Sequence, residues 1–136
     1  MSQTHIDHIG IVVADIEVAV ERFRPLLGEA DPIRELTDYG LRVAMIETAN
    51  VTIELLQYTG EGDDFARGIM GERLGLNHIS TRVDDVAGSV VDLTAAGFEM
   101  MEGFPRPGAH GEVAFFERDA STGLLFEVCA PDDDHA

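Results

Sequence analysis

The order of apolar and polar residues predicts a set of secondary-structure elements that occurs twice along the chain. Short continuous apolar runs are typical of buried strands, and apolar residues that recur every three or four positions are typical of helices. Asp15 and Asp85 each precede a helical stretch, where an aspartate can cap the helix, and Gly28 and Gly97 follow it, where helices commonly end. The predicted strands cover 5–13, 34–38, 41–47 and 51–57 around the first helix, and 77–83, 98–101, 113–117 and 124–129 around the second.

A glycine-rich segment over 59–75 connects the two halves, and Phe65, Ile69 and Met70 indicate a short helix within it. Each half is therefore a strand, a helix and about three strands, in the order βαβββ. One such half would leave a face of its sheet uncovered, so two must pack together. We predict a single α+β domain over 4–131, with module one at about 4–58, module two at about 76–131 and an acidic tail at 132–136.

The repeat extends to residues that can carry chemistry. Asp7-His8-Ile9-Gly10 opens the first half and Asn77-His78-Ile79-Ser80 the second, and the apolar strand that closes each half contains a glutamate, Glu54 or Glu127. A lone histidine in an apolar strand is more often an ordinary buried residue than a ligand, and a lone glutamate there can face solvent. Buried charges are nevertheless rare unless they are paired or bound to metal. Two His and two Glu at matching places therefore favour a pseudosymmetric metal site.

The donor types limit which metal such a site would take. Two nitrogen and two oxygen ligands suit Zn²⁺, Co²⁺, Ni²⁺ or Mn²⁺, and ligand type alone does not choose among these ions. Coordination positions that the protein leaves open would admit substrate oxygens. Two opposed carboxylates could also move protons, as a general acid and base do.

A second candidate region is the stretch Pro105-Arg106-Pro107-Gly108-Ala109-His110-Gly111. It is either a connecting loop, because Pro and Gly are typical of turns, or a rigid rim that binds an anionic substrate. In the second case backbone N–H groups and basic side chains would bind the anion. The candidate substrate-binding residues are Arg106, Gly108, Ala109, His110 and Gly111.

Composition narrows the partners and the compartment. The chain has nine arginines and no lysine against 26 acidic residues, which gives a net charge of −17. Nucleic acid and anionic membranes are therefore poor partners, because their phosphates would be repelled. No apolar run approaches the ~20 residues that span a bilayer, and the N-terminus lacks a signal-peptide pattern. The single Cys129 fits a reducing compartment, so we expect a cytoplasmic protein. The acidity would also fit a salt-loving source.

Four stretches resemble methylmalonyl-CoA epimerases, a family of the vicinal oxygen chelate superfamily that includes glyoxalase I and extradiol dioxygenases. They are His5–Ile11, Ile53–Leu56, Gly75–Ile79 and Pro105–Gly111, and the resemblance runs from about His5 to Pro131. It implies paired βαβββ modules that form a curved, partly open mixed-sheet barrel around one divalent metal, Co²⁺ or Zn²⁺ in preference to Mn²⁺ or Ni²⁺. It maps the metal ligands onto His8, Glu54, His78 and Glu127. A homodimer is also implied.

The chain departs from the family at three places. The family often has two adjacent histidines at the third ligand, and here the first of them is Asn77. Some epimerases carry a catalytic glutamate at the position of Val43 and tend to have Gln at that of Glu54, so Glu54 is expected to supply the second carboxylate. The family's basic His-Pro-Lys before the last strand is Glu117-Arg118-Asp119 here. A basic patch that suits coenzyme A is thus replaced by a mixed, acidic one, which argues against coenzyme A as the acyl carrier.

The predicted function is interconversion of (R)- and (S)-methylmalonyl-CoA, a coenzyme A ester. Glu54 and Glu127 would remove and return the C2 proton through a metal-stabilised enolate. The alternatives are a glyoxalase I-like lyase or isomerase acting on a thiol adduct, and a non-catalytic small-molecule-binding member of the superfamily. Glyoxalases usually carry a different loop at 105–111, and drug-binding members commonly lose the metal ligands.

Overall fold

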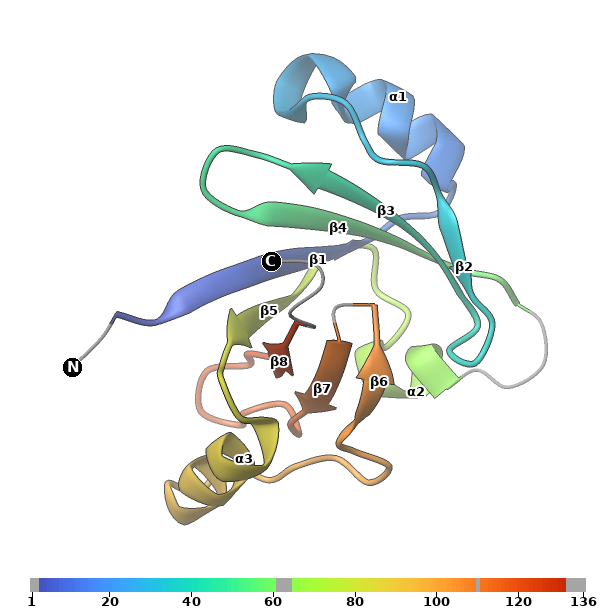
Figure 1. Cartoon of the computed structure of the whole chain (residues 1–136). Helices are drawn as coiled ribbons and strands as arrows, with labels where there is room; N and C mark the ends of the chain where they lie inside the picture. Colours follow the sequence, from blue (N-terminus) through green and yellow to red (C-terminus); the bar gives the residue numbers. More distant parts are fainter. Residues whose placement is uncertain (1–2, 61–64, 110, 132–136) are drawn as a thin grey trace. The chain divides into compact units, whose positions relative to one another are not determined.

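The computed structural model describes residues 3–60, 65–109 and 111–131, and the acidic tail therefore lies outside it (Figure 1). Within these residues the chain forms eight strands and three helices. In chain order they are β1 His5–Val12, α1 Ile16–Leu27, β2 Arg34–Leu36, β3 Leu41–Glu47, β4 Thr52–Tyr58, α2 Phe65–Met70, β5 Gly75–Arg82, α3 Val86–Ala95, β6 Arg106–Gly108, β7 Gly111–Phe115 and β8 Phe126–Ala130. Two compact units result, one over His8–Asn77 and one that combines the first residues of β1 with the chain from His78 onward.

The unit over His8–Asn77 has the strand order β2-β3-β4-β1. β1 runs parallel to β4, whereas β3 is antiparallel to both β4 and β2. α1 packs on β3 and β4, and it closes an apolar core with Ile16 and Leu55, both fully buried (Figure 1). Asp15 caps α1 as predicted, because its carboxylate accepts a hydrogen bond of 3.1 Å from the Val18 N–H. One sheet face is therefore closed by a helix, and the other carries the polar residues described below.

The connector contains α2, as the sequence indicated. Its backbone is joined to the strands, since the Ala66 N–H donates to the Tyr39 carbonyl at 3.1 Å. Asn77, the departure from the family's double histidine, donates from its side chain to the Met70 carbonyl at 2.9 Å. The Tyr58 hydroxyl donates to the carbonyl of Gly71. The described part of the connector is thus fixed at both ends of α2.

The second unit repeats the pattern with the order β5-β8-β7-β6. β5 is parallel to β8, and β7 is antiparallel to β8 and β6. Phe116 stacks on Phe126 with ring centroids 5.0 Å apart, and the Phe98 ring meets Phe126 edge-on at 5.1 Å. Each unit thus contains one series of elements in the order βαβββ, which confirms the predicted order of elements.

One predicted strand is wrong. Residues 98–101 make a single bridge, between Met100 and Phe116, and the first strand after α3 is β6 instead. The Phe98 ring packs on the Phe126 ring, which explains an apolar residue at this place. The backbone of residues 98–101 makes two hydrogen bonds with the chain around the bridge, among the described residues, and this is too little pairing for a strand. Among the described helices, none is long and apolar enough to cross a lipid bilayer.

Candidate functional site

In the unit over His8–Asn77, β1 and β4 bring His8 and Glu54 together. The two strands pair in parallel with Gly10 opposite Glu54, which places the histidine and the glutamate on neighbouring strands. His8 is 1% exposed and Glu54 is 5% exposed, so the alternative of a solvent-facing glutamate is excluded. The His8 Nε2 and Glu54 Oε1 atoms are 3.8 Å apart, too far for a good hydrogen bond. This separation leaves both atoms positioned to bind a common group.

The second unit contains the matching pair. His78 of β5 is 3% exposed and Glu127 of β8 is 5% exposed. A ring nitrogen of His78 and a carboxylate oxygen of Glu127 lie within 4.8 Å of each other. The Phe115 ring meets the His78 ring edge-on, with centroids 5.1 Å apart, and so limits how the imidazole can turn. Each module therefore supplies one buried imidazole and one buried carboxylate.

These donor sets fit a divalent metal. Buried carboxylates are rare without a charged partner or a metal, and imidazole with carboxylate is a common ligand combination for Zn²⁺ and its neighbours in the first transition row. The structure brings His8 to Glu54 and His78 to Glu127. The assignment of all four residues to one ion remains a prediction.

The stretch Pro105–Gly111 is a hairpin and not an unpaired connector. Arg106 lies opposite Val113, and Gly108 lies opposite Gly111, so β6 and β7 pair up to their turn. Gly111 has a φ of 82°, a backbone conformation that favours glycine. Arg106 and Ala109 are half-buried, and His110 lies outside the described residues. The paired backbone supports a rigid rim, and the binding role of its residues stays a prediction.

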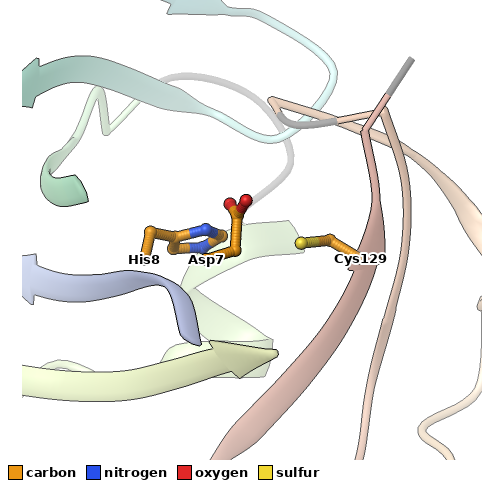
Figure 2. Close-up of side chains that lie close together, drawn as sticks. All are labelled: Asp7, His8 and Cys129. Atoms are coloured by element: carbon orange, nitrogen blue, oxygen red, sulfur yellow. The ribbon is translucent and has the colours of Figure 1, made fainter. Parts of the chain in front are cut away.

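An ion pair between Asp7 of β1 and the half-exposed Arg82 of β5 was not anticipated from the sequence. Arg82 donates to Asp7 Oδ1 from Nη2 at 2.9 Å and from Nε at 3.2 Å. The Asp7 side chain is 5% exposed. Figure 2 shows the Asp7 carboxylate, the following residue His8 and the side chain of Cys129; the Cys129 sulfur lies within 4.8 Å of the Asp7 carboxylate. Cys129 is fully buried, and the only sequence signal for Asp7 was its position before His8.

Comparison with known proteins identifies the family. Residues 7–116 match the model of the Glyoxalase/Bleomycin resistance protein/Dioxygenase superfamily. The chain belongs to this superfamily. An ethylmalonyl-CoA/methylmalonyl-CoA epimerase of Cereibacter sphaeroides is 34% identical over 128 residues, which cover 90% of this chain and 95% of that protein.

Solved structures with the same fold support this assignment. A hypothetical protein from Bacillus halodurans C-125 superposes with a TM-score of 0.84 at 28% identity, over 97% of both chains. A variant of Streptomyces coelicolor methylmalonyl-CoA epimerase, in complex with 2-nitronate-propionyl-CoA, superposes with a TM-score of 0.80 at 27% identity, also over 97% of both. The predicted vicinal oxygen chelate fold and the resemblance to methylmalonyl-CoA epimerases are therefore confirmed, and these similarities support an enzyme of the isomerase class.

This chain has an apolar residue, Val43, at the position where some epimerases carry a catalytic base. Val43 is 1% exposed, pairs with Leu56 of β4 and Arg34 of β2, and has no ionisable group. Glu54 lies on the neighbouring strand, opposite Met45. The described part of this unit thus places a carboxylate on β4 and none at position 43, in line with the departure noted in the sequence.

Proposed function

We propose that this protein is an epimerase of a 2-methyl-branched malonyl thioester, with methylmalonyl-CoA as the substrate. The observation that carries the proposal is the buried His–Glu pair that each module supplies, His8 with Glu54 and His78 with Glu127. The 34% identity with an ethylmalonyl-CoA/methylmalonyl-CoA epimerase supports this substrate class. The carbon between a carboxylate and a thioester carries an acidified proton, and its removal and return on opposite faces is the whole reaction.

In this proposal His8, Glu54, His78 and Glu127 hold one divalent ion, with Co²⁺ or Zn²⁺ favoured. When bound, the ion would act as a Lewis acid that stabilises the negative charge developing on the acyl oxygens. The protein contributes burial as well as ligands. All four residues are at most 5% exposed, and exclusion of water strengthens every charge interaction at the site.

Glu54 and Glu127 are the groups that we assign to proton transfer. They come from corresponding closing strands, β4 and β8, of two modules with the same order of elements. This internal repeat supports a placement of the two carboxylates toward opposite faces of C2. One would take the proton as a general base, while the other, protonated, would return a proton to the other face. In the reverse direction the two residues exchange roles.

The hairpin of β6 and β7 would bind the anionic part of the substrate. Arg106 provides a guanidinium in a chain that has only nine arginines and no lysine. Gly108 and Gly111, which pair at the end of the hairpin, would provide backbone N–H groups. The homodimer and the cytoplasmic location remain predictions.

The test of this function is proton exchange at C2. Purified, metal-loaded protein in D₂O should incorporate deuterium at C2 of methylmalonyl-CoA and should convert either stereoisomer into a mixture of the two C2 epimers. Mass spectrometry and chiral analysis of the thioester measure the two events. Absence of exchange by fully loaded protein, with turnover of a glutathione hemithioacetal instead, would show that the chain is a glyoxalase I-like enzyme.

A further inference from the structure

The hydroxyl of Ser80 is a buried polar group whose hydrogen-bond partner is missing. Ser80 is fully buried, and its Oγ atom has no hydrogen-bond partner among the described residues. Buried hydroxyls are nearly always hydrogen-bonded in folded proteins, either to protein or to something that the site binds. The Ser80 hydroxyl therefore needs an acceptor that the described residues do not provide.

Ser80 lies on the face of β5 that carries His78. Alternate residues of a strand point to the same face, so Ser80 follows His78 on one face and Thr81 points to the other. In the parallel pair of β5 and β8, Ser80 lies opposite Glu127. The hydroxyl thus belongs to the same buried face as the histidine and the glutamate of module two.

Thr81 shows that the opposite face is a different environment. Together with Ile79, Phe126 and Val128, it lines an open groove of about 1220 Å³. His78, Ser80 and Glu127 do not line that groove. Thr81 is therefore a neighbouring hydroxyl on the same strand, directed away from the candidate site.

Module one has no counterpart to the Ser80 hydroxyl. The matching position in the opening motif is Gly10, which lies opposite Glu54 in the parallel pair of β1 and β4, as Ser80 lies opposite Glu127. Both modules present a His and a Glu, but at this position module two has a hydrogen-bond donor in its side chain and module one has none. The substrate under the proposed function is also unequal at its two ends, because a carboxylate and a thioester flank C2.

We propose that the Ser80 hydroxyl donates a hydrogen bond to the free carboxylate of the bound acyl group, and so fixes which end of the substrate faces module two. This inference rests on the proposed function. The carboxylate is the favoured acceptor because a hydrogen bond to a charged oxygen is stronger than one to a neutral thioester carbonyl. Ser80 is then a specificity-determining contact in addition to the proposed ligands and bases.

Equilibrium binding to two thioesters tests the contact. Isothermal titration of metal-loaded protein with methylmalonyl-CoA, and with propionyl-CoA, which lacks the carboxylate, gives a Kd for each. Ser80→Ala should weaken methylmalonyl-CoA binding roughly 10- to 100-fold, the range for a lost hydrogen bond to a charged group. The Kd of propionyl-CoA should be unchanged. Thr81→Val, which removes the outward hydroxyl, should bind both thioesters as the wild type does.

Several results would overturn the inference. They are a wild-type Kd for methylmalonyl-CoA in Ser80→Ala, equal weakening of both thioesters, or the same loss in Thr81→Val. Ser80→Gly, which copies the residue of module one, provides a second variant if Ser80→Ala does not fold, and metal analysis of each variant shows that the ion is retained. If the wild type binds and exchanges methylmalonyl-CoA while Ser80→Ala binds it equally well, only the Ser80 contact is wrong. If the wild type binds neither thioester, the proposed function is wrong and this inference with it.

Discussion

Glu54 and Glu127 combine two proposed tasks, metal binding and proton transfer, and substitution by Gln separates them. Glutamine keeps a ligating oxygen but cannot readily accept a proton. We expect metal content to survive in Glu54→Gln and Glu127→Gln while turnover falls by about 10²-fold or more, the usual scale for a lost general acid or base. Each variant should also be impaired in exchanging the C2 proton of one stereoisomer more than the other. Elemental analysis and deuterium exchange of the separate stereoisomers measure these effects.

The two variants also serve as controls for each other. If Glu54→Gln keeps its metal and epimerises at the wild-type rate, Glu54 is only a ligand. His110 or a bound water would then have to be the second acid–base group. If both variants lose metal together with activity, the experiment assigns ligand roles and leaves the bases to be found elsewhere. Val43 is excluded in either case, because a buried valine cannot exchange a proton.

Burial changes the pKa of Tyr58, the last residue of β4, where the chain enters the connector. Its hydroxyl donates to the Gly71 carbonyl, and burial raises the pKa of Tyr58 to about 12. Because the pKa is raised in the folded state, the associated stability is fully present below pH 10, the ordinary pKa of tyrosine, and is lost as the pH rises to about 12. Tyrosinate absorbance of Tyr39→Phe protein, in which Tyr58 is the remaining tyrosine, should therefore titrate with a midpoint at about pH 12. A midpoint near 10 would show that the hydroxyl is solvated.

At the scale of elements, the two module helices begin alike in sequence but differ in their caps. The Asp15 carboxylate accepts a hydrogen bond from the Val18 N–H, whereas the Asp85 side chain makes no capping hydrogen bond, although its backbone is extended in the same way. Asp15→Ala should therefore lower the free energy of unfolding by about 1 kcal/mol. Asp85→Ala is the matched control and should cost clearly less. Denaturant titration of both variants compares them, and equal losses would contradict the structural difference.

Most helices and strands could be placed from the sequence because apolar residues recur along them at regular intervals. α1 ends at Leu27, before Gly28 as predicted, and β4 covers Thr52–Tyr58 where 51–57 was expected. β6 was not predicted as a strand, because its Pro and Gly residues are typical of turns, whereas β7 at Gly111–Phe115 overlaps the strand expected over 113–117. The strand predicted over 98–101 was wrong because an apolar residue there does not mark a strand. Phe98 is apolar because its ring packs on the Phe126 ring.

The candidate site was predictable to the extent that the sequence repeats. His8, Glu54, His78 and Glu127 could be selected because each pair occurs at matching places in both halves, and the structure confirms that all four are buried. The Asp7–Arg82 ion pair has no such signal, because its two partners are 75 positions apart and do not stand at matching places in the two halves. Ser80 could be found only once its burial and its missing partner were known.

For the molecule as a whole, the proposed ligand set makes metal binding depend on both modules at once. An ion that binds only the folded protein stabilises it by about 2.7 kcal/mol when free metal is 100 times its Kd. Metal should therefore raise the Tm of the wild type, and a chelator should reverse the rise. Because each module supplies one histidine, His8→Ala and His78→Ala should each lose most of this rise and bind less than one equivalent of metal. His5→Ala, in the same strand as His8 but exposed, is the matched control and should keep the full rise. A full metal-dependent rise in either His8→Ala or His78→Ala would remove that residue from the ligand set and would contradict the dependence of the site on a histidine from each module.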